Sequence, residues 1–146
     1  ERAQEADALI MAAAGADFRP DTVEPRKIKK SEGGVEALDL RLRRTPDVLL
    51  AVKAQREASG WPRVVVGFAA ESEDLVENAR GKLVRKGLDL MVANDISAAD
   101  AGFGADTNRV TLIDAQGNAE PLALTSKALV GEAVIARVAA LLAARD

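Results

Sequence analysis

Two strongly aliphatic segments, separated by a helical stretch, constrain this chain most. Residues 63–70 (RVVVGFAA) and 89–94 (DLMVAN) have the length and apolar content of strands that are buried on both faces. A helix is expected to open at Ser72 or Glu73 and to end at Gly87, because glycine commonly follows the last helical residue. The order strand–helix–strand predicts a parallel sheet, since parallel strands need such a crossover.

The remaining segments extend this pattern over the whole chain. We expect a buried strand at 8–14 and a half-buried strand at 38–43, which could pair with the basic segment 27–30 across Gly33 and Gly34. A helix should follow from Thr45, its N-cap, to about Ala58, with Pro46 as its first residue. Strands are then expected at 110–114 and 120–124, and a last helix from Thr125 or Ser126 to about Ala144. The predicted fold is α/β, a single domain over residues 1–146. It has a three-layer, Rossmann-like, mostly parallel sheet with helices on both faces and a β-hairpin flap.

Composition excludes several kinds of chemistry. The chain has 146 residues and contains neither Cys nor His, so thiolate nucleophiles, Cys/His zinc sites and Ser-His-Asp triads are ruled out. The net charge of −3 argues against general binding to nucleic acid or to a membrane surface. No apolar run reaches the roughly 20 residues that span a bilayer. A cytoplasmic protein is expected.

Open α/β sheets bind ligands beyond the carboxyl ends of their strands, so the residues after Ala14, Phe68 and Asn94 are the candidates. Small residues from Ala12 to Ala14 would let a flat ligand approach the backbone, and Asp17 could accept hydrogen bonds from it. Phe68 could stack on a base, and Glu71 could touch a metal. The alternatives stay open: a tight crossover, a core phenylalanine with a helix-capping glutamate, and Asx turns around Asn94 and Gly102–Gly104.

Two groups of lysines could bind an anion. Lys27 and Lys29 alternate around Ile28 and would project to one face of an extended segment, toward a polyphosphate. Lys82 and Lys86 are four residues apart and share one helix face. The alternative in both cases is a solvated charged face, with Lys82 and Lys86 paired to Asp74 and Glu77.

Taken in order, these motifs resemble one family. They are AAAGADF, KIKK, TPDVL, VVVGFAAE, NARGKLVRKGLDL, VANDIS and FGADTNRVTLI, and they extend from about residue 7 to residue 142. The family is the phosphopantothenate–cysteine ligase domain, in bacteria usually the C-terminal half of a bifunctional flavoprotein of coenzyme A synthesis.

The resemblance implies a ligase that activates 4′-phosphopantothenate with CTP and Mg²⁺ to an acyl-cytidylate, which the amine of cysteine then attacks. FMN would belong only to a decarboxylase half. The resemblance also implies a homodimer, or a higher oligomer when the two halves are fused. It further implies that a glycine-rich segment precedes the part of the domain present here, so that this chain alone is expected to lack full activity.

The family's nucleotide contacts fall on positions that match its motifs, and Lys27 corresponds to its lysine for the activation step. The residues are Met11, Ala12, Ala13, Asp17, Lys27, Pro46, Asp47, Val48, Leu49, Phe68, Lys82 and Lys86. The metal ligands stay unassigned. Two alternatives remain: a nucleotide-binding fragment without turnover, and a Rossmann-type domain for NAD or flavin. The absence of a GxGxxG motif counts against the latter.

Overall fold

The computed structural model describes residues 3, 5–28, 38–71, 73–96 and 106–145. The chain divides into two compact units. The single ligase domain expected over residues 1–146 stays a prediction. The first unit joins Glu1–Ala12 to Val48–Asp146, and the second is Ala13–Asp47. Both connections between the units lie between β1 (Ala8–Met11) and α1 (Val48–Ser59), so the second unit is an insertion into the first.

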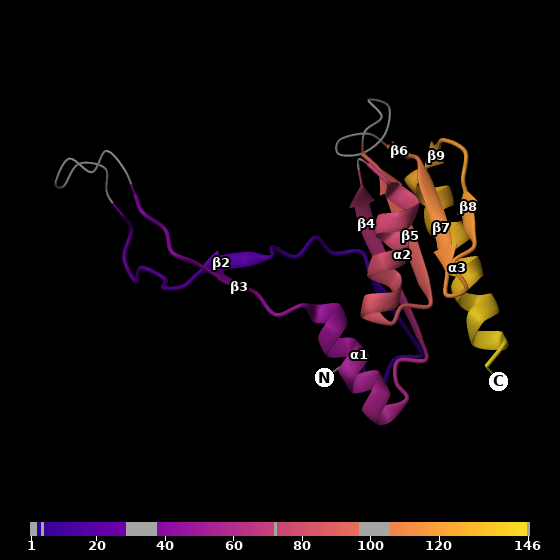
Figure 1. Cartoon of the computed structure of the whole chain (residues 1–146), viewed down its shortest axis with the longest axis horizontal. Coiled ribbons are helices and arrows are strands. Elements are labelled where there is room, and N and C mark those ends of the chain that lie inside the picture. The colour runs from indigo at the N-terminus through magenta and orange to yellow at the C-terminus, as the bar shows by residue number, and fades with distance from the viewer. Residues whose placement is uncertain (1–2, 4, 29–37, 72, 97–105, 146) are drawn as a thin grey trace. The chain divides into compact units, whose positions relative to one another are not determined.

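The first unit contains a five-stranded sheet (Figure 1). Its strands, in spatial order, are β1, β4 (Val64–Glu71), β5 (Leu90–Asp95), β7 (Val110–Asp114) and β8 (Ala119–Pro121). β1, β4 and β5 run parallel, β7 runs antiparallel to β5, and β8 runs antiparallel to β7. Four of the five strands therefore share one direction, which confirms the predicted mostly parallel sheet.

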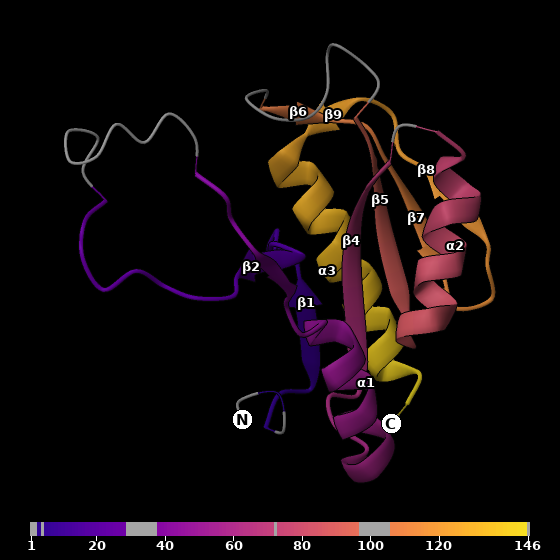
Figure 2. The same ribbon diagram turned by 60° about the vertical axis from the view of Figure 1, so that its left-hand side comes forward.

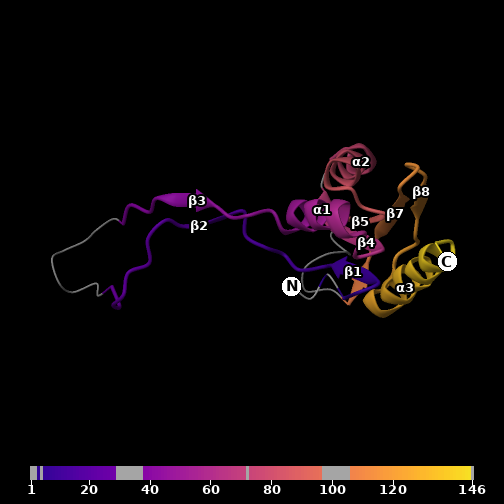
Figure 3. The ribbon, with the colours of Figure 1, turned by 90° about the horizontal axis from the view of Figure 1, so that it is seen from below.

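Helices cover both faces of this sheet, as predicted. α1 and α2 (Leu75–Lys86) lie on one face and α3 (Lys127–Ala143) lies on the other (Figure 3). Alternation along β4 separates the two layers, because Val65 and Ala69 belong to the core cluster of α1 and α2, whereas Val64 and Val66 belong to that of α3. The α3 layer is built on a row of valines four residues apart, namely Val130, Val134 and Val138.

Three local features shape the turns and helix ends, and the sequence predicted the helix ends at Gly87 and Ser126. Gly117 takes a positive φ of 85° in the turn between β7 and β8. The Ser126 hydroxyl accepts a hydrogen bond from the Leu129 amide and caps α3. Gly87 ends α2 with a φ of 63°. A short pairing of β6 (Thr107–Asn108) with β9 (Thr125–Ser126) was not predicted, and it precedes α3 (Figure 2).

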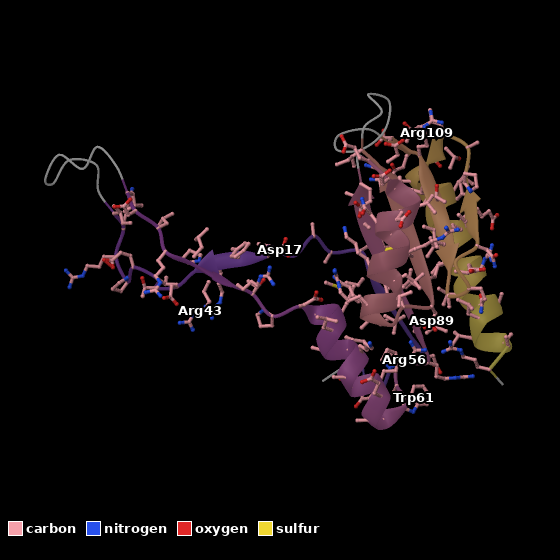
Figure 4. The ribbon with its side chains drawn as sticks, viewed as in Figure 1. Asp17, Arg43, Arg56, Trp61, Asp89 and Arg109 are labelled. Atoms are coloured by element: carbon pink, nitrogen blue, oxygen red, sulfur yellow. The ribbon has the colours of Figure 1, made fainter. Side chains whose placement is uncertain are left out.

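A buried carboxylate joins three elements at the amino end of the sheet. Asp89 is 6% exposed and accepts a hydrogen bond from the Val65 amide at 2.7 Å. Its oxygens also lie 3.0 Å from both terminal nitrogens of Arg56 on α1 and 2.6 Å from Arg145, just beyond α3. Figure 4 shows Arg56 and Asp89 close together at this end. The carboxylate is therefore fully compensated, as a buried charge must be.

The second unit contains two short antiparallel strands, β2 (Phe18–Pro20) and β3 (Leu42–Arg44). Asp21 lies 2.7 Å from the Arg43 guanidinium, and Arg44 lies over the Phe18 ring, 6.0 Å from its centroid. The predicted half-buried strand at 38–43 is wrong. Strand pairing starts only at Leu42, and all three residues of β3 are exposed, because the described part of this unit offers no helix or second sheet to pack on. The proposed partner segment 27–30 falls partly outside the described residues.

The start of α1 also differs from the prediction. Thr45 does not cap the helix, and Pro46 and Asp47 precede it, since α1 begins at Val48. Instead, the Thr45 hydroxyl donates to the Ala16 carbonyl at 2.5 Å, and the Thr45 amide donates to the Asp17 carbonyl at 2.9 Å. The threonine therefore joins the two ends of the second unit.

Candidate functional site

The carboxyl ends of β1, β4 and β5 meet at one edge of the sheet, because the three strands are parallel. Met11, the last residue of β1, lies beside Gly67, and Phe68 follows it on β4. Glu71 and Asp95 end β4 and β5 opposite each other. α1 runs from β1 back to β4, so its first residues, Val48 and Leu49, belong to the same edge.

A cation from α2 reaches this edge. The Lys82 ammonium lies 2.5 Å from a carboxylate oxygen of Glu71, whose side chain is only 10% exposed, compared with 38% for Lys82. The spacing of charges in the sequence left open a pairing of Lys82 with Asp74, just before α2, or with Glu77 on the helix. The observed partner is instead the strand residue that precedes the helix. Lys86 lies one turn further from the edge and also interacts with another residue.

Phe68 and Lys82 lie at the same edge but on opposite faces of the sheet. By alternation along β4, Phe68 falls on the α3 side with Val64 and Val66, and Glu71 falls on the side of α1 and α2. The Phe68 side chain is 39% exposed, so its ring is open to a ligand. A ligand that contacts both Phe68 and Lys82 must therefore extend over the edge of the sheet.

Asn94 is a polar residue at the end of β5 that the sequence singled out. Its side-chain oxygen is buried and has no hydrogen-bond partner in the described part of the chain. Asp95, beside it, does have a partner. The segment Gly102–Gly104 lies outside the described residues.

The predicted site residues divide between the two units. Met11, Ala12, Val48, Leu49, Phe68, Lys82 and Lys86 belong to the first unit; Ala13, Asp17, Lys27, Pro46 and Asp47 belong to the second. In the second unit, Asp17 and Lys27 are both exposed, and Asp17 lies near β2 (Figure 4). Of the first-unit residues, Met11, Val48, Leu49 and Phe68 lie toward the carboxyl edge of the sheet and the Lys82 ammonium reaches it, whereas Lys86, the last residue of α2, lies one turn further away. The convergence of both sets on one pocket stays a prediction.

The described residues contain neither a cluster of metal ligands nor a helix that could span a membrane. No group of three or more carboxylates among them is close enough to hold a metal ion. In the same residues, no helix is both long enough and apolar enough to cross a membrane. A metal that needs only one or two carboxylates together with ligand phosphates, as Mg²⁺ commonly does, remains compatible with Glu71 and Asp95 at the strand ends.

Comparisons with known proteins agree with this fold. The family described as DNA/pantothenate metabolism flavoprotein C-terminal domain matches residues 1–142. The Coenzyme A biosynthesis bifunctional protein CoaBC of Bacillus subtilis (strain 168) is 44% identical over 135 residues, which cover 92% of this chain and 32% of that relative. A protein of an unknown prokaryotic organism, named Cysteine/Cysteine sulfinic acid decarboxylase, is 37% identical and covers 94% of this chain and 37% of its own length.

A solved structure of a CoaBC protein also resembles this chain in fold and in sequence. The crystal structure of the C-terminal domain of a Coenzyme A biosynthesis bifunctional protein CoaBC matches with a TM-score of 0.69 and 31% identity, over 97% of this chain and 59% of that one. This chain spans about a third of the length of the two curated relatives. The chain therefore belongs to the family of the DNA/pantothenate metabolism flavoprotein C-terminal domain, the C-terminal part of CoaBC, which confirms the resemblance found in its sequence.

Proposed function

We propose that this chain carries the nucleotide-activating part of a ligase that joins 4′-phosphopantothenate to cysteine with CTP. The observation that carries the proposal is the 44% identity to a CoaBC protein over 92% of the chain. The edge of the sheet fits it, because an aromatic ring, small neighbours and a fixed ammonium group suit a nucleotide. The substrates are CTP, 4′-phosphopantothenate and cysteine. Mg²⁺ would accompany the triphosphate.

The reaction takes place in two steps. A carboxylate oxygen of phosphopantothenate attacks the α-phosphorus of CTP, and the bond to pyrophosphate breaks. The amine of cysteine then attacks the carbonyl of the acyl-cytidylate, loses a proton, and displaces CMP. Phosphoryl chemistry of this kind depends mainly on positioning and on neutralising charge, which lysine ammonium groups can provide without His or Cys.

The residues of this chain have separate tasks in the proposal. Phe68 presents an exposed ring for the base, and Lys82 presents an ammonium group for the phosphates. The resemblance assigns Lys27, an exposed residue of the second unit, to the activation step, and Asp17 to a contact with the nucleotide. We propose that the protein is cytoplasmic, which the absence of Cys fits, and that it forms homodimers, as the family resemblance implies.

The decisive assay for activation is release of pyrophosphate from CTP in the presence of phosphopantothenate, before cysteine is added. Lys27→Gln should reduce the rate at least about a hundredfold, because it removes charge stabilisation from the transition state. Arg26→Gln, which removes a neighbouring exposed cation, is the control and should keep the rate. If Lys27→Gln were as active as the unaltered chain, its role in activation would be wrong.

A nucleotide-binding module without turnover is the second candidate, because the exposed Phe68 and the Lys82 ammonium at the edge of the sheet would serve binding alone. Calorimetry with CTP, ATP and NAD tests both candidates together against the Rossmann-type cofactor domain. Preference for CTP supports the ligase family, and preference for NAD overturns it. CTP binding without pyrophosphate release would favour the binding module.

A further inference from the structure

Lys82 is assigned to the phosphates above, but Glu71, the partly buried carboxylate paired with it, has no role in the reaction as described so far. Lys82 projects from the third turn of α2, a surface position from which a lysine would ordinarily extend into water. Its ammonium group instead lies 2.5 Å from Glu71, which ends β4. The glutamate therefore determines that the positive charge lies at the carboxyl edge of the sheet.

Lys82 can hardly leave this carboxylate when a ligand binds. The Glu71 side chain is 10% exposed, and Lys82 is its only partner recorded among the described residues. A mostly buried carboxylate without its counterion is strongly disfavoured. An ammonium group has three N–H donors, so Lys82 can keep one on Glu71 and direct two at an anion through its 38% exposed surface.

Glu71 also relieves a repulsion within α2. Lys82 and Lys86 are spaced by four residues on the helix, where like charges destabilise each other. Pairing with Glu71 compensates the charge of Lys82 and restricts a side chain that otherwise has about 2 kcal/mol of rotamer freedom.

From these contacts we infer that Glu71 is a positioning residue for nucleotide binding: it holds the Lys82 ammonium at the strand edge so that two of its donors meet the phosphates of the bound nucleotide. This inference rests on the proposed function, since it takes CTP as the ligand. Glu71 itself does not touch the nucleotide. Its effect on binding should therefore pass entirely through Lys82.

A double-mutant cycle measured by calorimetry with CTP tests this dependence. Lys82→Met should weaken CTP binding by roughly ten- to a hundredfold, the usual worth of a hydrogen bond to a charged group. Glu71→Ala should weaken it by a similar factor, and the double variant should bind no worse than either single variant. Glu71→Gln keeps an acceptor for Lys82 and should restore part of the affinity.

Two controls separate positioning from folding and from general charge. Glu57→Ala removes the carboxylate of an exposed pair, Lys53 and Glu57, whose closest atoms are 4.0 Å apart, and should leave CTP affinity unchanged. The variant Glu71→Gln/Lys82→Met removes both charges together, so it leaves no buried ion unpaired. Its circular dichroism should match that of the unaltered chain and show that loss of binding is not loss of fold.

The outcomes distinguish the two proposals. If Lys82→Met weakens binding but Glu71→Ala leaves it unchanged or strengthens it, or if the two effects multiply, the positioning role is wrong and the proposed function stands. If Lys82→Met has no effect, the positioning role is also wrong. If the unaltered chain does not bind CTP, the proposed function fails and the positioning role fails with it.

Discussion

Position 67 must be glycine because Leu88 packs directly against its backbone. It lies in β4 where a β-carbon would come within 2.6 Å of a Leu88 methyl group, closer than such atoms approach. Leu88 is 3% exposed and belongs to the core cluster of α1 and α2. The absence of a side chain at position 67 is therefore a condition for packing this layer, next to Phe68 on the same strand.

Gly67→Ala should lower the free energy of unfolding by about 1–3 kcal/mol, because the core must shift to admit the methyl group. The matched control is Gly81→Ala in α2, where a β-carbon would meet nothing within 4 Å. That change should raise stability by about 1 kcal/mol, the difference in helix propensity. Urea unfolding followed by circular dichroism measures both. Equal stability of the two variants would contradict the close contact with Leu88.

Single-residue roles were predictable from the sequence only where they depend on local structure. Gly87 and Ser126 were recognised as helix ends because capping needs only residues three or four positions away. The pairing of Lys82 with Glu71 was missed because local spacing favoured Asp74 and Glu77. The role of Thr45 was missed for the same reason, since its partner Ala16 is 29 residues away.

Among the elements, the turn between β7 and β8 depends on one carboxylate. Asp114 accepts hydrogen bonds from the Gln116 amide at 3.0 Å, the Asn118 amide at 2.8 Å and the Asn118 side chain at 2.8 Å. Partial burial raises the pKa of Asp114, but these bonds and the charge of Arg137 outweigh it, so the pKa lies below its ordinary value of 3.8. The ionised carboxylate is therefore part of the turn.

This turn should lose stability in acid. Because the folded pKa of Asp114 is lowered, its contribution is fully present above the unfolded pKa and is lost as the pH falls through the folded pKa. Asp114→Asn should be less stable than the unaltered chain at neutral pH, and the difference should shrink as both are acidified. Urea unfolding at a series of pH values measures this. A difference that stays constant with pH would show that ionisation of Asp114 is not involved.

The elements with continuous apolar patterns were those predicted best from the sequence. β4, β5 and β7 were found within two residues of their expected ends, because burial on both faces leaves a long aliphatic run. The exposed β2 was not predicted, and β3 was expected at the wrong residues with the wrong partner, because the alternation of leucine and charge at 38–43 does not reflect burial. Alternation of apolar and polar residues predicts a strand correctly only where one face of that strand packs on a core.

In the molecule as a whole, the two units differ in what holds them together. Both core clusters are formed by residues of the first unit, and none of the described residues between 13 and 47 belongs to them. The described part of the second unit relies on strand pairing and on the ion pairs of Asp21. A two-stranded ribbon of this kind is only marginally stable by itself.

Replacing residues 13–47 by a long Gly/Ser linker should therefore leave the first unit folded. The shortened protein should unfold cooperatively, because it retains every residue of both core clusters. CTP affinity should fall, since Asp17 and Lys27 are removed. Loss of cooperative unfolding in the shortened protein would show that the second unit contributes to the core.

The contact between Arg145 and Asp89 has a practical consequence for anyone who attaches a fluorophore or an affinity handle to this polypeptide. The two residues are 56 positions apart in sequence, yet the arginine donates to the carboxylate at 2.6 Å. A dye coupled at position 145 would perturb the beginning of β5 rather than hang freely from a tail. Spectroscopic probes are better placed on the outward side of α2, for example at Val84, which is 72% exposed.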